Sequence, residues 1–256
     1  MAEFAQLEDI DVYESLNPAS LTRAQKKAAL RALNLVKEKR NGKLKGRTCA
    51  DGRSQRSLYD KSQTASPTVS NDALILSIII EAFEGRDVAT ADVAGAYLKA
   101  HMDDFVVMKF VGTSVRILCE LNPSHEQNVV FENGVEVLYA RLIKALYGCV
   151  KSALLLYKLF TGTLKKMVGF VLNPYNLCVA NCMINGTQCT ICWYVDDMKI
   201  SHVHPNVVTR IIGQLEEHFD TMTVTRGKEH VFRVMSIRYD TDNINEGVSA
   251  RSNCRV

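Results

Sequence analysis

The stretch TQCTICWYVDDMKIS, residues 187–201, decides the fold of this chain. Its first half is rich in β-forming residues, and the carboxylates Asp196 and Asp197 follow at once. Because Asn185-Gly186 is a strong signal for a two-residue hairpin turn, residues 177–184 are expected to pair with this first half. The stretch therefore predicts strands joined by tight turns, with two acidic side chains together at one of them.

The order of elements around this stretch predicts an α+β fold. Strand-like runs from Val88 onward are followed by a helix, a hairpin, a second helix and a last strand, which is the order of a split βαβ sheet. Such an antiparallel sheet carries its two helices on one face and leaves the other face free for a large substrate. The expected elements are strands at 88–93, 105–110, 115–121 and 231–239, a hairpin at Asn133-Gly134, and helices at 152–168 and after Pro205.

The first third of the chain differs from the rest in charge. Between Leu21 and Lys61 it has thirteen Lys or Arg residues against three acidic ones, whereas the whole chain has a net charge of only +3. A basic arm on an acidic body is typical of a protein that handles phosphates with one part and metal ions with another. Residues 21–40 are predicted as a basic helix and residues 41–66 as a hairpin or loop. A helix at 72–83, apolar almost all round, is expected to be buried.

Length and composition are typical of a globular protein. Of the 256 residues, 47% are hydrophobic and 23% are charged, which excludes wholesale disorder and fibrous structure. The sequence shows no secretory signal and no apolar run long enough to span a membrane. The chain is therefore expected to be intracellular, with its eight cysteines reduced.

Three aspartates predict a metal site. Asp92 lies in an apolar strand, where a carboxylate is costly unless it is paired or binds a metal. If that strand neighbours the hairpin, Asp92 meets Asp196 and Asp197 at one edge of the sheet. Hard cations such as Mg²⁺ bind carboxylate oxygens and cancel the repulsion between adjacent acids. Three carboxylates can hold two metal ions for phosphoryl transfer, in which a hydroxyl attacks and pyrophosphate leaves.

Structural alternatives compete with a metal site. A solvated turn would also explain the Asp196-Asp197 doublet, and Asp103-Asp104 is interpreted as solvated because no apolar strand leads into it. Four cysteines between residues 178 and 192 invite a zinc site. Residues three apart in a strand point to opposite faces, however, so buried thiols are favoured over a zinc site.

The two aspartate motifs resemble those of a known family. The segment DVAGAYL, residues 92–98, is similar to the first catalytic motif of reverse transcriptases, and YVDD, residues 194–197, is similar to the second. Further matches point to the Ty1/copia-type retrotransposon reverse transcriptase domain, with its fingers and palm: Leu146-Tyr147-Gly148, Gly169-Phe170 and Ser66-Pro67. The resemblance runs from about Lys43 to Tyr239.

This resemblance implies a set of metal ligands. Asp92, Asp196 and Asp197 would be the catalytic residues and would hold two Mg²⁺ ions, or Mn²⁺ in their place. The carbonyl oxygen of Val93 would assist. Tyr194 and Val195 complete the second catalytic motif, and Leu146, Tyr147 and Gly148 form the motif at the entry of a helix.

The resemblance also implies a nucleotide-binding set. Lys45 and Arg47 would grip the triphosphate of a dNTP from the fingers hairpin, the Arg as a bidentate fork and the Lys as a point charge. Tyr97 would lie under the sugar and exclude a 2′-hydroxyl group, and Lys151 would contact the nucleotide or template. The alternatives are a core aromatic at Tyr97 and solvent-exposed cations at Lys45 and Arg47.

Two departures from the family pattern keep a second function open. Lys151 stands where the family usually has Gln, and Arg233-Val234 stands where the family tends to have Leu-Gly. The resemblance implies an RNA-directed DNA polymerase that adds dNTPs to a primer on an RNA/DNA template. The alternative is an inactive, decayed remnant that keeps the fold and binds nucleic acid non-specifically through phosphates.

The resemblance also implies a division of the chain into regions, a set of partners and a cellular location. Residues 1–40 would form a basic helical extension, 41–86 a fingers-like region, 87–240 a palm-like region and 241–256 a tail, with no thumb or RNase H segment. The expected partners are dNTPs and a template-primer, with no membrane, and the sequence does not set the oligomeric state. The expected location is the cytoplasm, with virus-like particles or the nucleus as further sites.

Overall fold

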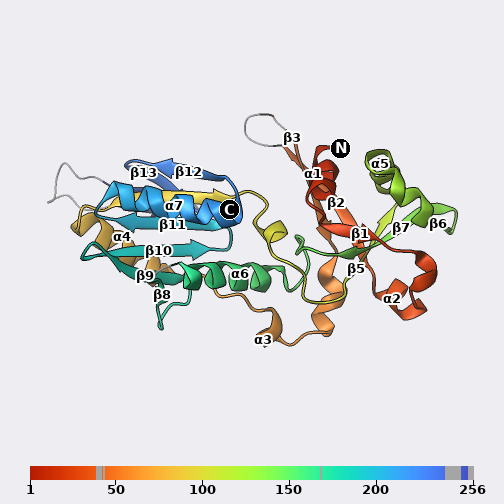
Figure 1. The fold of residues 1–256 in the computed structure, drawn as a ribbon, viewed down its shortest axis with the longest axis horizontal. Coiled ribbons are helices and arrows are strands. Elements are labelled where there is room, and N and C mark those ends of the chain that lie inside the picture. The colour runs from red at the N-terminus through yellow and green to blue at the C-terminus, as the bar shows by residue number, and fades with distance from the viewer. Residues whose placement is uncertain (39–41, 43, 168, 240–248, 253–256) are drawn as a thin grey trace. The chain divides into compact units, whose positions relative to one another are not determined.

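The computed structural model describes the chain except for residues 39–41, 43, 168, 240–248 and 253–256. The chain folds into two compact units, each built from segments far apart in sequence (Figure 1). Residues 1–65 and 97–156 form the first unit, and residues 66–96 and 157–256 form the second. Within the described part of the chain, no helix combines the length and apolar character that a membrane span requires.

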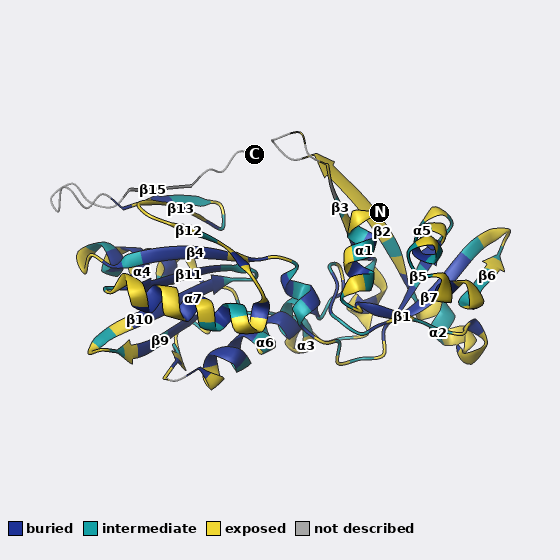
Figure 2. Cartoon of the chain, turned by 45° about the horizontal axis from the view of Figure 1, so that its top comes forward, coloured by how far each residue is buried: buried dark blue, intermediate teal, exposed yellow. Residues whose placement is uncertain are grey.

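The second unit is built on one antiparallel sheet. Its strand order is β12-β4-β11-β10-β9-β8, and the central strands are buried (Figure 2). The predicted hairpin is confirmed, since Asn185 and Gly186 both have positive φ in the turn between β9 and β10. The strands are β4 (Asp87–Val93), β8 (Val171–Leu172), β9 (Val179–Ile184), β10 (Thr187–Tyr194), β11 (Asp197–His202) and β12 (Met222–Arg226).

Two helices pack on one face of this sheet, as predicted. They are α6 (Ser152–Lys166) and α7 (Pro205–Phe219). The ring of Trp193 in β10 lies 4.9 Å from that of Phe160 in α6, and Phe160 lies 5.7 Å from Phe219 in α7. These rings form the core between the sheet and its helices.

The opposite face is not free, contrary to the prediction. Lys199 of β11 points there, because the residues on either side of it face α6 and α7. Its ammonium donates to Ser77 of α4 (Asn71–Phe83) at 2.9 Å and forms an ion pair with Glu81 of the same helix. Both charges are buried and compensate each other. Sequence periodicity missed this contact because the residues involved are polar.

The predicted burial of the apolar helix is only half correct. Leu74 and Ile78 of α4 are buried, but one stripe of apolar side chains is exposed: Ile75, Leu76, Ile79 and Phe83, the last at 91%. The helix meets the sheet through the face that carries Ser77 and Glu81, so its other apolar face is left without cover in this structure.

The first unit contains a second six-stranded sheet. Its order is β1-β7-β5-β2-β3, with β6 beside β7. Its core includes Phe110 and Met108 of β5 and Leu138 of β7, which are fully buried. The strands are β1 (Tyr13–Ser15), β2 (Leu30–Glu38), β3 (Leu44–Ala50), β5 (Val107–Val111), β6 (Val129–Glu132) and β7 (Val135–Leu142). The helices are α1 (Ala2–Asp9), α2 (Arg23–Ala28), α3 (Lys61–Thr64) and α5 (Thr113–Leu121).

The predicted helix over residues 21–40 is wrong. Only α2 is helical there, started by a capping box between Thr22 and Gln25, and β2 follows it. β2 pairs with β3 over seven residues and with β5 at its start, so cross-strand pairing overrides the helix propensity of its Leu, Ala and Lys residues. Residues 1–40 are also not a separate extension, because Phe4 and Leu7 lie in the core of the first unit.

Two predicted strands also differ from the structure. Residues 115–121 belong to the helix α5, which buries Val115 and Leu118 at helical spacing. The strand expected at 231–239 is a hairpin of β13 (Glu229–Phe232) and β14 (Met235–Arg238). Of the predicted tail, residues 249–252 form β15 (Ser249–Ser252) beside β14, and residues 241–248 and 253–256 lie outside the described part of the chain.

Candidate functional site

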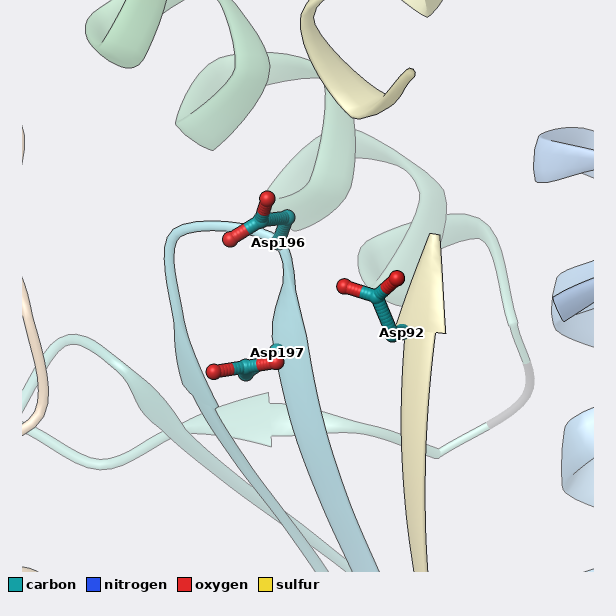
Figure 3. Close-up of side chains that lie close together, drawn as sticks. All are labelled: Asp92, Asp196 and Asp197. Carbon is teal, nitrogen blue, oxygen red and sulfur yellow. The ribbon is translucent and has the colours of Figure 1, made fainter. Parts of the chain in front are cut away.

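The second unit brings the three predicted aspartates together. β4 and β11 are antiparallel neighbours, and Asp92 lies directly opposite Asp197. Asp196 precedes Asp197 in the turn between β10 and β11. The N–H of Val93 donates a hydrogen bond to the backbone carbonyl of Asp196 at 3.4 Å. Carboxylate oxygens of all three lie within 4.8 Å of one another, at one end of the sheet (Figure 3).

A strained turn presents the doublet. Only Val195 and Asp196 join β10 to β11, and Val195 has a φ of +60°. A β-branched residue rarely adopts this conformation. Such outliers persist only where surrounding contacts hold them in place, and they are more common at active sites than elsewhere. The turn keeps Asp196 beside the strand end that carries Asp197.

The cluster has an electrostatic cost without a cation. Partial burial, followed by repulsion from Asp196 and Asp92, raises the pKa of Asp197 to about 6. A hydrogen bond from the backbone N–H of Arg233 acts in the opposite direction. A divalent cation would offset both the burial and the repulsion.

The donor set fits a hard divalent metal ion. Three carboxylates supply only oxygen ligands, which Mg²⁺ and Mn²⁺ prefer. The candidate zinc cysteines are arranged differently: Cys182 faces Cys189 across the β9–β10 pair, and Cys192 lies on the other face of β10, opposite Lys199. These sulfurs therefore do not converge on one tetrahedral site.

One residue of this site was not predicted from the sequence. The guanidinium of Arg233 lies 4.2 Å from the ring centre of Tyr194, the first residue of the YVDD motif. The sequence marks Arg233 only as a departure from the family pattern, and the contact depends on a hairpin that was predicted as a continuous strand.

The first unit brings three motif residues together around one ring. The guanidinium of Arg47 lies 4.7 Å from the ring centre of Tyr147, and Tyr97 packs edge-on against the same ring at 4.7 Å. Arg47 and Tyr147 were predicted in separate roles, and the stacking connects them. Lys45 lies in β3 opposite Lys37, and its side chain lies outside the described residues.

Lys151 is held by two acids that were predicted to be solvated. Its ammonium lies 2.5 Å from Asp103 and 2.9 Å from Asp104, and Tyr59 donates a hydrogen bond to Asp104 at 2.7 Å. Burial lowers the pKa of Lys151, but the two carboxylates outweigh burial and raise it. Asp103 is exposed, as predicted, with 42% of its side chain accessible, and Asp104 is half-buried. The prediction missed the ion pairs with Lys151, whose single positive charge offsets part of the negative charge of the two acids.

A close approach between two backbone segments explains the glycine of the Leu-Tyr-Gly motif. The N–H of Ala50 donates to the carbonyl oxygen of Tyr147 at 2.7 Å, and Leu146 is buried. A Cβ atom on Gly148 would lie 2.0 Å from the carbonyl oxygen of Ala50, and Gly148 has a φ of +91°. Only glycine fits this close approach.

Family and protein comparisons agree with the two aspartate motifs. A profile described as "Reverse transcriptase (RNA-dependent DNA polymerase)" matches residues 20–245. The chain is 26% identical over 202 residues to the Transposon Ty1-BL Gag-Pol polyprotein of Saccharomyces cerevisiae, covering 79% of this chain and 10% of that protein. It is 25% identical over 218 residues to the Ty1-BR Gag-Pol polyprotein of the same organism, covering 83% and 11%. The chain thus spans about a tenth of these relatives.

Solved structures of low sequence identity are also similar. One is a foamy viral protease-reverse transcriptase in complex with double-stranded DNA, with a TM-score of 0.44, 12% identity, and coverage of 91% of this chain and 32% of that chain. Another is apo telomerase from Candida tropicalis, with a TM-score of 0.49, 9% identity, and coverage of 98% and 52%. The family match spans most of the chain and includes both aspartate motifs, and the Ty1 relatives confirm the predicted copia-type resemblance. This chain belongs to the reverse transcriptase family.

Proposed function

We propose that this chain is the polymerase region of a Ty1/copia-type reverse transcriptase. It would add dNTPs to a primer on an RNA/DNA template, as an RNA-directed DNA polymerase. The observation that supports this activity most directly is the convergence of Asp92, Asp196 and Asp197 within 4.8 Å at one end of the sheet. This geometry suits phosphoryl transfer, in which negative charge develops on the reacting oxygens.

The three aspartates are assigned to hold two Mg²⁺ ions, or Mn²⁺, with help from the Val93 carbonyl. Such ions activate the attacking hydroxyl and neutralise the leaving pyrophosphate when they are bound. The chain would provide ionised carboxylates that are held in fixed positions. β4 and β11 fix Asp92 and Asp197 by their pairing, and the strained Val195 turn fixes Asp196.

The nucleotide is assigned to the first unit. The Arg47 guanidinium lies over the ring of Tyr147, which would hold it in place to donate paired hydrogen bonds to a triphosphate. Lys45, on the same strand, would add a point charge. The ring of Tyr97, fixed edge-on by Tyr147, would exclude a 2′-hydroxyl group. Lys151 would make a weaker contact, because Asp103-Asp104 already neutralises its charge.

We assign the two units to the fingers and the palm of a reverse transcriptase. The β2–β3 hairpin of the first unit corresponds to the fingers, and the six-stranded sheet of the second unit corresponds to the palm. The partners would be a template-primer and dNTPs. The proposed location is the cytoplasm, including virus-like particles.

A decayed, inactive remnant is the second candidate. The observation that favours it is Lys151, which replaces the usual Gln and is tied to Asp103 and Asp104. Such a remnant would bind duplex nucleic acid in a salt-dependent way through phosphates, without extending a primer.

Primer extension on poly(rA)/oligo(dT) with Mg²⁺ separates the two candidates. The wild-type chain should incorporate dTTP, and Asp196→Asn should abolish incorporation. Glu217→Gln is the matched control, because it removes one negative charge from an exposed position of α7. Equal signals from wild type and Asp196→Asn would reject the enzyme, and salt-dependent binding without extension would support the remnant.

A further inference from the structure

The turn between β13 and β14 lies against the turn that carries the carboxylates. Arg233 and Val234 alone join the two strands of this hairpin. The guanidinium of Arg233 lies 4.2 Å from the ring centre of Tyr194, the last residue of β10. The backbone N–H of Arg233 lies close enough to the carboxylate of Asp197 to lower its pKa. One residue therefore contacts both sides of the carboxylate turn.

A third contact ties Arg233 to the start of α4. Its Nη1 donates to Oδ1 of Asn71, the first residue of that helix, at 2.7 Å. A guanidinium can lie flat on an aromatic ring while its edge donates a hydrogen bond, which an ammonium or an aliphatic side chain cannot do at once. Arg233 thus links the carboxylate turn, the β13–β14 turn and α4.

Both turns hold a residue in an unfavourable backbone conformation. Val195 and Arg233 each have a φ of +60°, a region that favours glycine. Such strain persists only where surrounding contacts over-determine the conformation. The contacts of Arg233 with Tyr194 and Asp197 meet this requirement, because they join one strained turn to the other.

We propose that Arg233 is a positioning residue of the metal centre, which fixes the Tyr194–Asp197 turn so that its two carboxylates are preorganised for a divalent cation. The inference rests on the proposed function, since it takes the aspartate cluster to be a cation site. Leucine, which the family tends to have at this position, would keep the backbone N–H beside Asp197. It would lose both the stacking on Tyr194 and the bond to Asn71.

The test measures Mn²⁺ binding to the full chain without nucleic acid, by electron paramagnetic resonance of the free ion. Arg233→Leu should weaken binding about tenfold, as is common when a group that orients metal ligands is removed. Arg233→Lys keeps the positive charge but loses the planar group, so it should weaken binding to a similar extent. Asn71→Ala removes only the third contact and should give a smaller loss.

Two further variants separate positioning from folding. Arg238→Leu removes an exposed arginine of the same hairpin, which pairs with Glu229 at 3.9 Å, and should leave Mn²⁺ affinity unchanged. Arg233→Gly keeps the backbone N–H and relieves the positive φ, so it should fold even if the Leu variant does not. Its Mn²⁺ binding should still be weakened. Thermal unfolding shows which variants are folded.

Two patterns would overturn the assignment of Arg233. The first is equal Mn²⁺ affinity in wild type, Arg233→Leu and Arg233→Gly. The second is tighter binding in Arg233→Leu with wild-type binding in Arg233→Lys, since Arg233 would then act only as a repelling charge. Failure of the wild-type chain to bind Mn²⁺ would be a different result, and it would overturn the metal assignment of the proposed function together with this inference.

Discussion

Asp92 of β4 and Asp197 of β11 lie directly opposite each other in an antiparallel pair, with both side chains at one end of the sheet. Like charges in this arrangement destabilise a sheet. Asp196 adds a third carboxylate within the same 4.8 Å cluster. The sheet therefore carries an electrostatic cost at this end, which a bound cation would offset.

Cation binding should depend on pH near 6. Burial, followed by repulsion from Asp196 and Asp92, raises the pKa of Asp197 to about 6. Below this pH the carboxyl group holds a proton that a cation must displace, so Mn²⁺ affinity should fall as the pH falls from about 7 to about 5. Titration calorimetry across this range measures the trend. An affinity that stays constant, or rises at the acidic end, would contradict the assignment of Asp197 as a ligand.

Gly148→Ala should destabilise the first unit by about 2–4 kcal/mol, because the added methyl group would lie against the Ala50 carbonyl at a positive φ. Urea unfolding measures the change in free energy. Gly162→Ala is the matched control, since a Cβ at this helical position of α6 meets no atom within 4 Å. The control should be neutral or stabilising by up to about 1 kcal/mol. Equal effects of the two substitutions would refute the close-approach explanation.

Tyr97→Ala should let the chain incorporate ribonucleotides, because the ring that is proposed to exclude the 2′-hydroxyl group would be gone. The measurement is the ratio of kcat/KM for dTTP to that for UTP. This ratio should fall by at least about tenfold, which corresponds to a loss of about 1.4 kcal/mol in transition-state discrimination. Tyr175→Ala removes a tyrosine ring that is 96% exposed and should leave the ratio unchanged. Unchanged sugar selectivity in Tyr97→Ala would remove this residue from its assigned role.

Glu81→Gln should destabilise the second unit by about 3–5 kcal/mol, because it leaves the buried Lys199 ammonium without its carboxylate. The double variant Glu81→Leu/Lys199→Met replaces both charges with apolar side chains and should recover most of that loss. Urea unfolding of both variants gives the comparison. A double variant that is less stable than Glu81→Gln would show that the pair does more than compensate two buried charges.

Local signals explain which elements could be predicted. The β9–β10 hairpin follows from Asn185-Gly186, and α7 follows from Pro205 and an apolar stripe at helical spacing. Both are encoded within a few neighbouring residues. The strand β2 could not be predicted in the same way, because its Ala, Leu and Lys residues favour a helix. Its pairing with β3 and β5 decides the outcome.

The same distinction applies to the candidate site. Asp92 and the Asp196-Asp197 doublet stand out in the sequence because charges at the ends of apolar strands need an explanation. The Lys151 contacts with Asp103-Asp104 and the Arg233 contact with Tyr194 join residues that are remote in sequence, so no local pattern predicts them. The stacking of Arg47 on Tyr147 is of the same kind.

Anomalous diffraction from crystals grown with Mn²⁺ tests the central claim most directly, because it locates the metal without relying on activity. The account predicts two anomalous peaks, each within coordination distance of carboxylate oxygens of Asp92, Asp196 or Asp197, and both absent from crystals of Asp196→Asn. A map with no peak beside these aspartates at saturating Mn²⁺, or with peaks only at other carboxylates, would contradict it.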